Sequence, residues 1–352
     1  MKQSYPVGET DKILSESTPP KNVLAIVVTR IGDTLLCTPA LRALKETWPD
    51  CRLTVIAHSE RGSVLRGLSF IDELKGFHHW RCWVEGWRRT RKFDLAFLFH
   101  GDQEKLNYAR KVASHVFSDP IPGAKRDGLV TFVPASVSPL AAVDDRLRIV
   151  RFAGADTNCR RLSYVVSDVE KDWARKFLDK HEIKSRGPRI AIQLKGFPTK
   201  SNRDWPFESF KALVGRIINF YPDSFFLITG DRESKADATE LKKCFPEKIL
   251  DTTGQCSLRE TASLIGQMDL YVGPDTGPTH LAGALQVPMV GIYRAAVPSR
   301  FMTPFDHPMF RAVDHPRSGA SNPHDAAMDE ITVDSVWMAV EDLLIRSGFC
   351  PI

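Results

Sequence analysis

Two apolar, β-branched segments constrain the fold of this chain most strongly. Residues 23–28 are followed by a turn through Gly32, and residues 189–194 are followed by Lys195 and Gly196; a helical pattern comes after each turn. Strands that alternate with helices indicate parallel sheets with crossover connections. In a chain of 352 residues, two such starts predict two similar α/β domains of ordinary size.

The expected domains are an N-terminal Rossmann-like domain over residues 21–186 and a C-terminal one over residues 187–352. Residues 1–20 are polar and are expected to form a flexible leader without the layout of a secretory signal. No apolar run reaches the ~18 residues that a membrane span needs. Seven dispersed cysteines with no Cys-x-x-Cys spacing favour reduced thiols in a cytoplasm and argue against a cysteine-based zinc site.

The modest formal charge of +5 is concentrated locally in residues 80–92, which mix three tryptophans with five basic residues. One interpretation is a solvated helix face with aromatic anchors in the core. The other is a surface for an anionic partner, either a phosphorylated glycolipid or lipid head groups. Nucleic acid is not expected, because no nucleic-acid motif accompanies the stretch.

A first candidate site follows the first predicted strand, where Gly32 permits a tight turn and Asp33 opens the next helix. In parallel α/β folds, ligands bind beyond the carboxyl ends of the strands. Asp33 is therefore either an N-cap that satisfies free helix amides or a general base that takes a proton from an attacking hydroxyl. The missing Gly-x-Gly-x-x-Gly argues against a dehydrogenase.

A second candidate site lies where a strand ending near Gly273 turns into a helix that carries Pro278 near its start. Free amides at a helix N-terminus bind anions, so a diphosphate is expected there. Asp275 either holds the turn or contacts sugar hydroxyls, and His280 is either a ligand contact or a residue hydrogen-bonded inside the fold. The candidate donor-binding residues of this turn are Asp275, Thr276, Gly277, Thr279 and His280.

A third candidate site is the basic loop after the second domain's first strand. Lys195, Lys200 and Arg203 are placed to neutralise a diphosphate leaving group. The turn of Gly230 and Asp231, after another predicted strand, is a candidate for holding the nucleoside.

These sites occur together with further motif residues in a recognisable order. Asp33 is followed by Thr-Leu-Leu-Cys-Thr-Pro-Ala-Leu-Arg-Ala-Leu44, then come Asn202-Arg-Asp-Trp-Pro206 and Asp275-Thr-Gly-Pro-Thr-His-Leu-Ala282 with Val287-Pro288. Over roughly residues 21–345 the chain resembles the heptosyltransferases of bacterial lipopolysaccharide core synthesis, glycosyltransferase family 9. It departs from the family pattern at Arg294, where glycine is common, and over residues 307–327.

The resemblance implies a GT-B fold, in which two Rossmann-like domains with parallel sheets face each other across a cleft. It implies an inverting transfer, needing no metal or other cofactor, from an ADP-heptose donor to a lipopolysaccharide core or lipid-linked acceptor. Asp33 falls on the catalytic base and Arg203 on the basic residue that contacts phosphate. The expected location is the cytoplasm, with contact at the inner face of the inner membrane. Acceptor-binding candidates in the first domain are Arg30, Arg61, Arg88 and Arg89.

Three alternatives stay open. The same fold and chemistry could serve another nucleotide sugar or a protein or capsule acceptor. A non-catalytic nucleotide-sugar binding protein is a second alternative, although it would have no need of the base Asp33. The dehydrogenase, disfavoured above, is the third.

Overall fold

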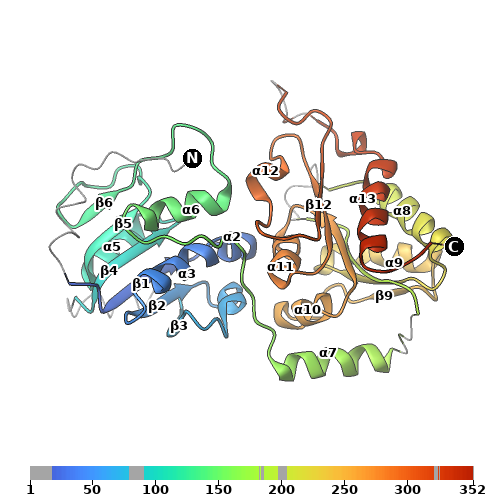
Figure 1. Ribbon diagram of the computed structural model, residues 1–352, viewed down its shortest axis with the longest axis horizontal. Coiled ribbons are helices and arrows are strands. Elements are labelled where there is room, and N and C mark those ends of the chain that lie inside the picture. Colours follow the sequence, from blue (N-terminus) through green and yellow to red (C-terminus); the bar gives the residue numbers. More distant parts are fainter. Residues whose placement is uncertain are drawn as a thin grey trace. The chain divides into compact units, whose positions relative to one another are not determined.

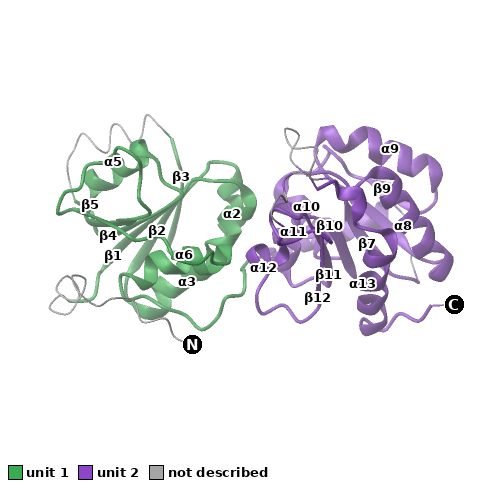
Figure 2. Ribbon diagram, turned by 90° about the horizontal axis from the view of Figure 1, so that it is seen from above, with its two compact units in different colours: residues 1–163 green, residues 164–352 purple. Residues whose placement is uncertain are grey.

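The structure is a computed structural model that describes residues 18–78, 91–181, 183, 186–196, 204–320, 324 and 326–351. The chain divides into two compact units, residues 1–163 and residues 164–352 (Figure 2). Almost all of the expected leader lies outside the described residues. Among the described residues, no helix is both long enough and apolar enough to span a membrane.

Unit 1 is an α/β unit built on one parallel six-stranded sheet in the order β3-β2-β1-β4-β5-β6 (Figure 1). Its elements are β1 (Asn22–Val27), α2 (Ile31–Leu36), α3 (Thr38–Thr47), β2 (Arg52–Ala57), η1 (Arg61–Leu65), β3 (Glu73–Gly76), β4 (Phe93–Phe99), α5 (Gln103–Val112), β5 (Ala113–Ser118), β6 (Val130–Phe132) and α6 (Ala142–Arg151).

Unit 2 has its own parallel six-stranded sheet, in the order β12-β11-β10-β7-β8-β9. Its elements are α7 (Asp168–Lys180), β7 (Arg189–Gln193), α8 (Phe207–Phe220), β8 (Phe225–Thr229), η3 (Arg232–Ser234), α9 (Lys235–Cys244), β9 (Ile249–Asp251), α10 (Leu258–Ile265), β10 (Leu270–Pro274), α11 (Gly277–Leu285), β11 (Met289–Tyr293), α12 (Ser299–Met302), β12 (Phe310–Asp314), η5 (Met328–Glu330) and α13 (Val333–Arg346).

The two units share one topology. Counted from its own first strand, each sheet has the order 3-2-1-4-5-6 of a Rossmann fold. In each unit the last helix packs against the first long crossover helix, α6 against α3 and α13 against α8. The expectation of two Rossmann-like α/β units with parallel sheets is therefore confirmed.

The central strands coincide with the apolar runs of the sequence because their residues are buried. In β1 and β7 every residue after the first is buried, and all five residues of β10 and β11 are buried. Strands of a parallel sheet covered on both faces have such continuous apolar sequences. Trp205, just before α8, is 1% exposed, and its indole Nε1 donates to the carbonyl of Ile331, 2.8 Å away.

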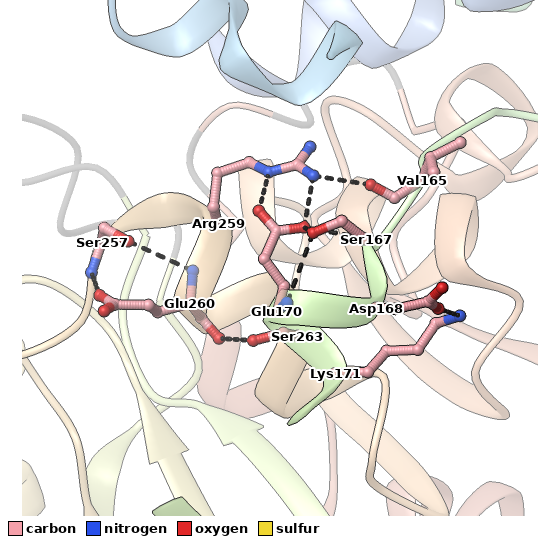
Figure 3. A network of polar contacts seen from close by, with 9 residues as sticks. All are labelled: Val165, Ser167, Asp168, Glu170, Lys171, Ser257, Arg259, Glu260 and Ser263. Carbon is pink, nitrogen blue, oxygen red and sulfur yellow. Dashed lines mark hydrogen bonds and ion pairs between the residues drawn. The ribbon is translucent and has the colours of Figure 1, made fainter. Parts of the chain in front are cut away.

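The boundary between the units falls at Ser163, earlier than the expected position near Arg186. The reason is α7, which packs against α10 of unit 2 (Figure 3). Glu170 of α7 receives two hydrogen bonds from Arg259 of α10, at 2.7 Å and 2.6 Å, and also completes a capping box with Ser167. A second capping box, formed by Ser257 and Glu260, begins α10.

Two His-Pro-Xaa sequences organise residues 307–317, the first part of the segment 307–327. Nδ1 of His307 accepts from the backbone N–H of Met309 at 3.2 Å, while Nε2 lies 2.9 Å from the carbonyl of Val287. His315 repeats this arrangement with the N–H of Arg317 at 3.0 Å and the carbonyl of Ala327 at 2.9 Å. An acceptor Nδ1 and a donor Nε2 define a neutral imidazole, so both histidines are structural.

Candidate active site

The turn after β1 places Asp33 within a helix. Arg30 is the N-cap of α2 and Asp33 is the third helical residue; no side-chain hydrogen bond caps this helix. The N-cap interpretation of Asp33 is therefore wrong, because helix formation begins three residues earlier than the sequence suggested. The Asp33 side chain, 30% exposed, remains available for chemistry.

Two side chains from distant parts of unit 1 converge on a single oxygen of Asp33. His100 Nε2 lies 3.6 Å from Asp33 Oδ1, and Arg146 Nη2 lies 3.5 Å from the same atom. Both separations exceed an ordinary hydrogen bond and fall within ion-pair range. The closest approach of each side chain is thus to Oδ1.

The sheet order explains why these residues meet. The order reverses between β1 and β4, which are neighbours, and this reversal is where ligands bind in open α/β sheets. Asp33 follows β1 and His100 follows β4 directly. His100 has a φ of +51°, a left-handed conformation that is uncommon for a residue other than glycine. Burial lowers the pKa of His100, the charge of Arg146 lowers it further, and Asp33 opposes both.

An arginine–aspartate network on α6 holds Arg146. Its Nη1 donates to Asp145 Oδ2 at 2.7 Å. The other oxygen of Asp145 accepts from Arg148 Nε at 3.1 Å. Arg148 also donates to Asp119 and to the carbonyl of Pro134. Although burial alone lowers the pKa of Arg148, its hydrogen bonds and ion pairs with Asp119 and Asp145 raise it overall, so this buried guanidinium is charged.

In unit 2, the strand order reverses between β7 and β10, and two predicted loops come together there. The backbone N–H of Gly196, after β7, donates to Asp204 Oδ1 at 2.6 Å. A Cβ on Gly196 would lie 3.0 Å from Asp204 Oδ1 and 3.1 Å from Thr276 Cγ2, so the loops after β7 and β10 are in contact. Burial raises the pKa of Asp204, although the hydrogen bond from Gly196 opposes it. Lys195 forms an ion pair with Asp237 at 2.9 Å.

Gln193, the last residue of β7, links the ends of neighbouring strands. Its Nε2 donates to the carbonyl of Lys195 at 2.6 Å, and its Oε1 accepts from Thr229 of β8 at 2.9 Å. Gly230 follows with a φ of +150°, and Asp231 caps η3 by accepting from the N–H groups of Glu233 and Ser234. The predicted nucleoside turn therefore exists, with Asp231 engaged in holding it.

The second predicted site is the N-terminus of α11. Thr276 is its N-cap, with no side-chain cap hydrogen bond, and a proline stands in the first turn. His280 Nε2 lies 3.3 Å from Asp275 Oδ1, and both side chains are largely buried. Within the described residues, that Asp275 oxygen has no hydrogen-bond partner, and neither has the buried hydroxyl of Tyr293 nearby on β11. The helix end therefore combines anion-binding amides with unsatisfied buried acceptor and hydroxyl groups.

A cavity of about 320 Å³ lies at the carboxyl ends of β2 and β3 in unit 1. Its polar lining includes His58, Ser59, Ser63, Arg66 and Lys75. The cavity shares η1 with the Asp33 turn, since α2 packs against this short helix. Burial lowers the pKa of His58, and the charge of Arg61, which begins η1, lowers it further. The predicted acceptor residue Arg61 thus lies beside the cavity, and Arg30 lies exposed at the start of α2.

Several of the site residues expected from the sequence lie in the described residues, and others do not. Lys200, Arg203, Arg88 and Arg89 lie outside the described residues, as does most of the 80–92 stretch. His100 was missed although it directly follows a predicted strand, so the rule that placed Asp33 could have found it. Asp204 lies within the motif of residues 202–206, but no role was predicted for it. Arg146 had no signal of its own, because its helix was not predicted.

Comparison with known proteins identifies the kind of molecule. Residues 160–317 match the model of glycosyltransferase family 9 (heptosyltransferase). This stretch, a little under half of the chain, is similar to that family. The resemblance indicated by the motifs and the expectation of a glycosyltransferase enzyme are thereby confirmed.

Full-length relatives accompany this family 9 match. Lipopolysaccharide heptosyltransferase 3 of Escherichia coli is 22% identical over 340 residues, which are 90% of this chain and 97% of the relative. The crystal structure of a family 9 glycosyl transferase from Veillonella parvula DSM 2008 has a TM-score of 0.80 at 18% identity, covering 93% of this chain and 97% of that one. E. coli ADP-heptose lps heptosyltransferase II has a TM-score of 0.75 at 18% identity, with coverage of 93% and 100%.

Proposed function

We propose that this chain transfers heptose from ADP-heptose to a lipopolysaccharide core or other lipid-linked acceptor, with inversion at the sugar carbon and without a metal ion. The observation that carries the proposal is Asp33, a partly exposed carboxylate at the point of unit 1 where the strand order reverses. The closest contacts of His100 and Arg146 are to Oδ1, and the carboxylate can receive a proton on Oδ2.

The proposed chemistry is a single displacement. The acceptor oxygen attacks the anomeric carbon while its proton passes to Asp33. The bond from that carbon to the diphosphate breaks, and its electron pair leaves with ADP. A positioned base contributes roughly 10²–10⁴-fold to such a reaction, because the hydroxyl is a poor nucleophile while it keeps its proton.

Unit 2 is the proposed donor-binding domain. The N-terminus of α11, with Thr276 and Gly277, would receive the diphosphate beside Lys195 and Gly196 of the β7 loop. Preorganised donors and positive charge stabilise a leaving diphosphate as its charge develops. Lys200 and Arg203, in the same loop, would supply further positive charge in place of a divalent ion.

Unit 1 is the proposed acceptor-binding domain. The cavity beside η1 offers hydroxyl groups and two basic side chains, Arg66 and Lys75, to a sugar that carries anionic groups. Arg30, Arg61, Arg88 and Arg89 would extend this basic surface. A lipid-linked acceptor would bring the enzyme to the cytoplasmic face of the inner membrane as a peripheral protein.

The relatives' names support the choice of sugar and acceptor: lipopolysaccharide heptosyltransferase 3 matches this chain over nearly its full length. The donor named for a structural neighbour is ADP-heptose. A different nucleotide sugar or a protein or capsule acceptor would use the same sites, and a non-catalytic nucleotide-sugar binder would use unit 2 alone.

Isothermal titration of the protein with ADP-heptose, ADP, and UDP- and GDP-sugars, with and without EDTA, tests the donor. We expect ADP-heptose to bind most tightly and EDTA to have no effect. Preference for another nucleotide would overturn the donor, and loss of binding in EDTA would overturn metal independence.

Replacing Asp33 with asparagine tests the base. We expect turnover to fall by roughly 10²–10⁴-fold while the Kd for ADP-heptose stays unchanged, because the donor is proposed to bind through unit 2. Equal turnover in Asp33→Asn and the wild type would rule out Asp33 as the base. If the wild type binds the donor but transfers sugar to no acceptor, the alternative of a non-catalytic nucleotide-sugar binding protein is favoured.

A further inference from the structure

The closest contacts of two side chains with Asp33 involve the same carboxylate oxygen. His100 Nε2 and Arg146 Nη2 both approach Oδ1, at 3.6 Å and 3.5 Å. They come from different elements, the end of β4 and helix α6, so their convergence is a product of the tertiary fold. Two donors directed at one oxygen fix the plane of a carboxylate and leave its other oxygen facing a different direction.

A comparison of Arg146 with Arg148 shows that the former is not fully used by the fold. All three nitrogens of Arg148 donate hydrogen bonds, to Asp145, Asp119 and the carbonyls of Val133 and Pro134. Arg146 donates through Nη1 to Asp145 and also contacts the thiol of Cys37, whereas its buried Nε has no hydrogen-bond partner among the described residues. Buried arginines normally satisfy their donors, so the unused capacity of Arg146 beside Asp33 points to a role in the reaction.

The backbone of His100 gives a second, independent observation. Its φ of +51° is unfavourable for a side chain with a Cβ, and glycine would adopt it freely. Strained conformations of this kind occur mainly where the surrounding structure needs the side chain in place. Here the strained residue directs its ring toward the Asp33 carboxylate.

We propose that Arg146 and His100 are positioning residues that hold Asp33 through Oδ1 and so present Oδ2 to the acceptor hydroxyl. This inference rests on the proposed role of Asp33 as the base. Neither residue touches the reacting atoms; both act through the orientation of the carboxylate, and Arg146 also acts through its charge.

The charged and titratable groups around Asp33 fit this assignment. They are His100 after β4, Asp119 after β5, Asp145 and Arg146 on α6, Cys37 at the end of α2, and Arg30 and Arg61 on the elements beside it. Burial raises the pKa of Cys37 to about 12, so its thiol stays neutral. Arg146 is the cation nearest to Asp33 among the ion pairs of the described residues.

Three variants test the proposal, each assayed as ADP release from ADP-heptose with lipopolysaccharide core oligosaccharide as the acceptor. Arg146→Gln removes the charge and should lower kcat by about 100-fold, the cost of misplacing a reacting group by about 1 Å. His100→Gly removes the ring and relieves the backbone strain, so we expect kcat to fall about 10-fold while Tm stays the same or rises. Arg151→Gln, on the same helix but paired with Asp144 and Asp156, is the matched control and should keep wild-type kcat.

Two further readouts separate positioning from a structural role. The KM for ADP-heptose and the Kd for ADP should be unchanged in every variant. A positioning arginine lowers kcat at an unchanged KM and Tm, whereas a purely structural arginine would lower Tm together with kcat.

The outcomes distinguish this proposal from the one on which it rests. If Asp33→Asn loses turnover but Arg146→Gln and His100→Gly both keep wild-type kcat, Asp33 stands as the base and the positioning proposal is overturned. If Asp33→Asn retains turnover, both proposals fall together. If Arg146→Gln does not fold, His100→Gly alone decides, since glycine is favoured at its φ.

Discussion

At the residue scale, Asp204 shows how one half-buried carboxylate can support a loop. It accepts the N–H of Gly196 and thereby fixes the start of the loop that carries Lys200 and Arg203. Burial raises its pKa, so its ionised form costs free energy in the folded state. The hydrogen bond and the charge of this side chain therefore act on stability in opposite directions.

Replacing Asp204 separates these two effects. Asp204→Asn keeps an acceptor for Gly196 and removes the buried charge, so we expect equal or greater stability at neutral pH. Asp204→Ala leaves the Gly196 N–H without its partner and should lower the free energy of unfolding by about 1–3 kcal/mol. It should also raise the KM for ADP-heptose. Urea unfolding and steady-state kinetics measure both.

The raised pKa of Asp204 fixes the direction in which the stability of the fold changes with pH. Because the folded state holds the Asp204 proton more tightly than the unfolded state, the wild type loses stability as pH rises from the ordinary value of 3.8 through the raised pKa. Asp204→Asn should lack this loss, whereas Asp179→Asn, an exposed control on α7, should retain it. Identical pH dependence in wild type and Asp204→Asn would contradict this account.

Residues that act locally could be predicted, and residues that act across the fold could not. Asp33 was found because a strand, a glycine turn and a helix adjoin it in the sequence. Arg146 reaches Asp33 from more than a hundred positions away, and only the packing of α6 against α2 brings them together. Without a predicted helix at residues 142–151, nothing in the sequence distinguished it from other arginines.

At the element scale, some strands could be predicted from the sequence around them and others could not. The strands β1, β2, β4, β7, β8, β10 and β11 coincide with apolar runs in the sequence and have buried interiors. The strands that were not predicted are β3, β6, β9 and β12, which form the edges of the two sheets, and β5, an interior strand whose sequence includes a histidine and two serines. An edge strand needs no continuous apolar sequence, because its neighbours define it.

The contact between α7 and α10 gives a prediction about one element. Arg259 donates two hydrogen bonds to Glu170 and one to the carbonyl of Val165 at 2.8 Å, and its guanidinium lies 4.7 Å from the centre of the Tyr164 ring (Figure 3). A double-mutant cycle of Glu170→Gln and Arg259→Gln should give a coupling free energy of about 1–3 kcal/mol at neutral pH. Urea unfolding followed by circular dichroism measures it.

The hydrogen bonds from Arg259 lower the pKa of Glu170 from 4.5 to about 2. A lowered carboxyl pKa stabilises the fold fully above pH 4.5, and this contribution is lost as pH falls toward about 2. The coupling should shrink over that range. The exposed pair Asp168 and Lys171 on the same helix is the control, and its coupling should be close to zero at every pH. Equal couplings for the two pairs would refute the special role of Glu170.

At the scale of the whole molecule, the proposed division of labour between the units can be measured directly. If unit 2 alone binds ADP, then saturating ADP should slow hydrogen exchange in the loops after β7 and β10 and leave the loops after β1 and β4 unchanged. A ligand at 100 times its Kd stabilises the state that binds it by about 2.7 kcal/mol. Hydrogen exchange followed by mass spectrometry resolves these loops, and protection in unit 1 by ADP alone would contradict the assignment.

The shared strand order of the two units has a consequence for how such a protein could arise and be altered. Two halves with one topology are what duplication and fusion of a single ancestral unit would leave behind. The family match, residues 160–317, falls almost entirely in the second half. The junction near Ser163 is accordingly a natural crossover point for recombination. Chimeras joined there would keep both cores whole and could combine one donor half with many acceptor halves.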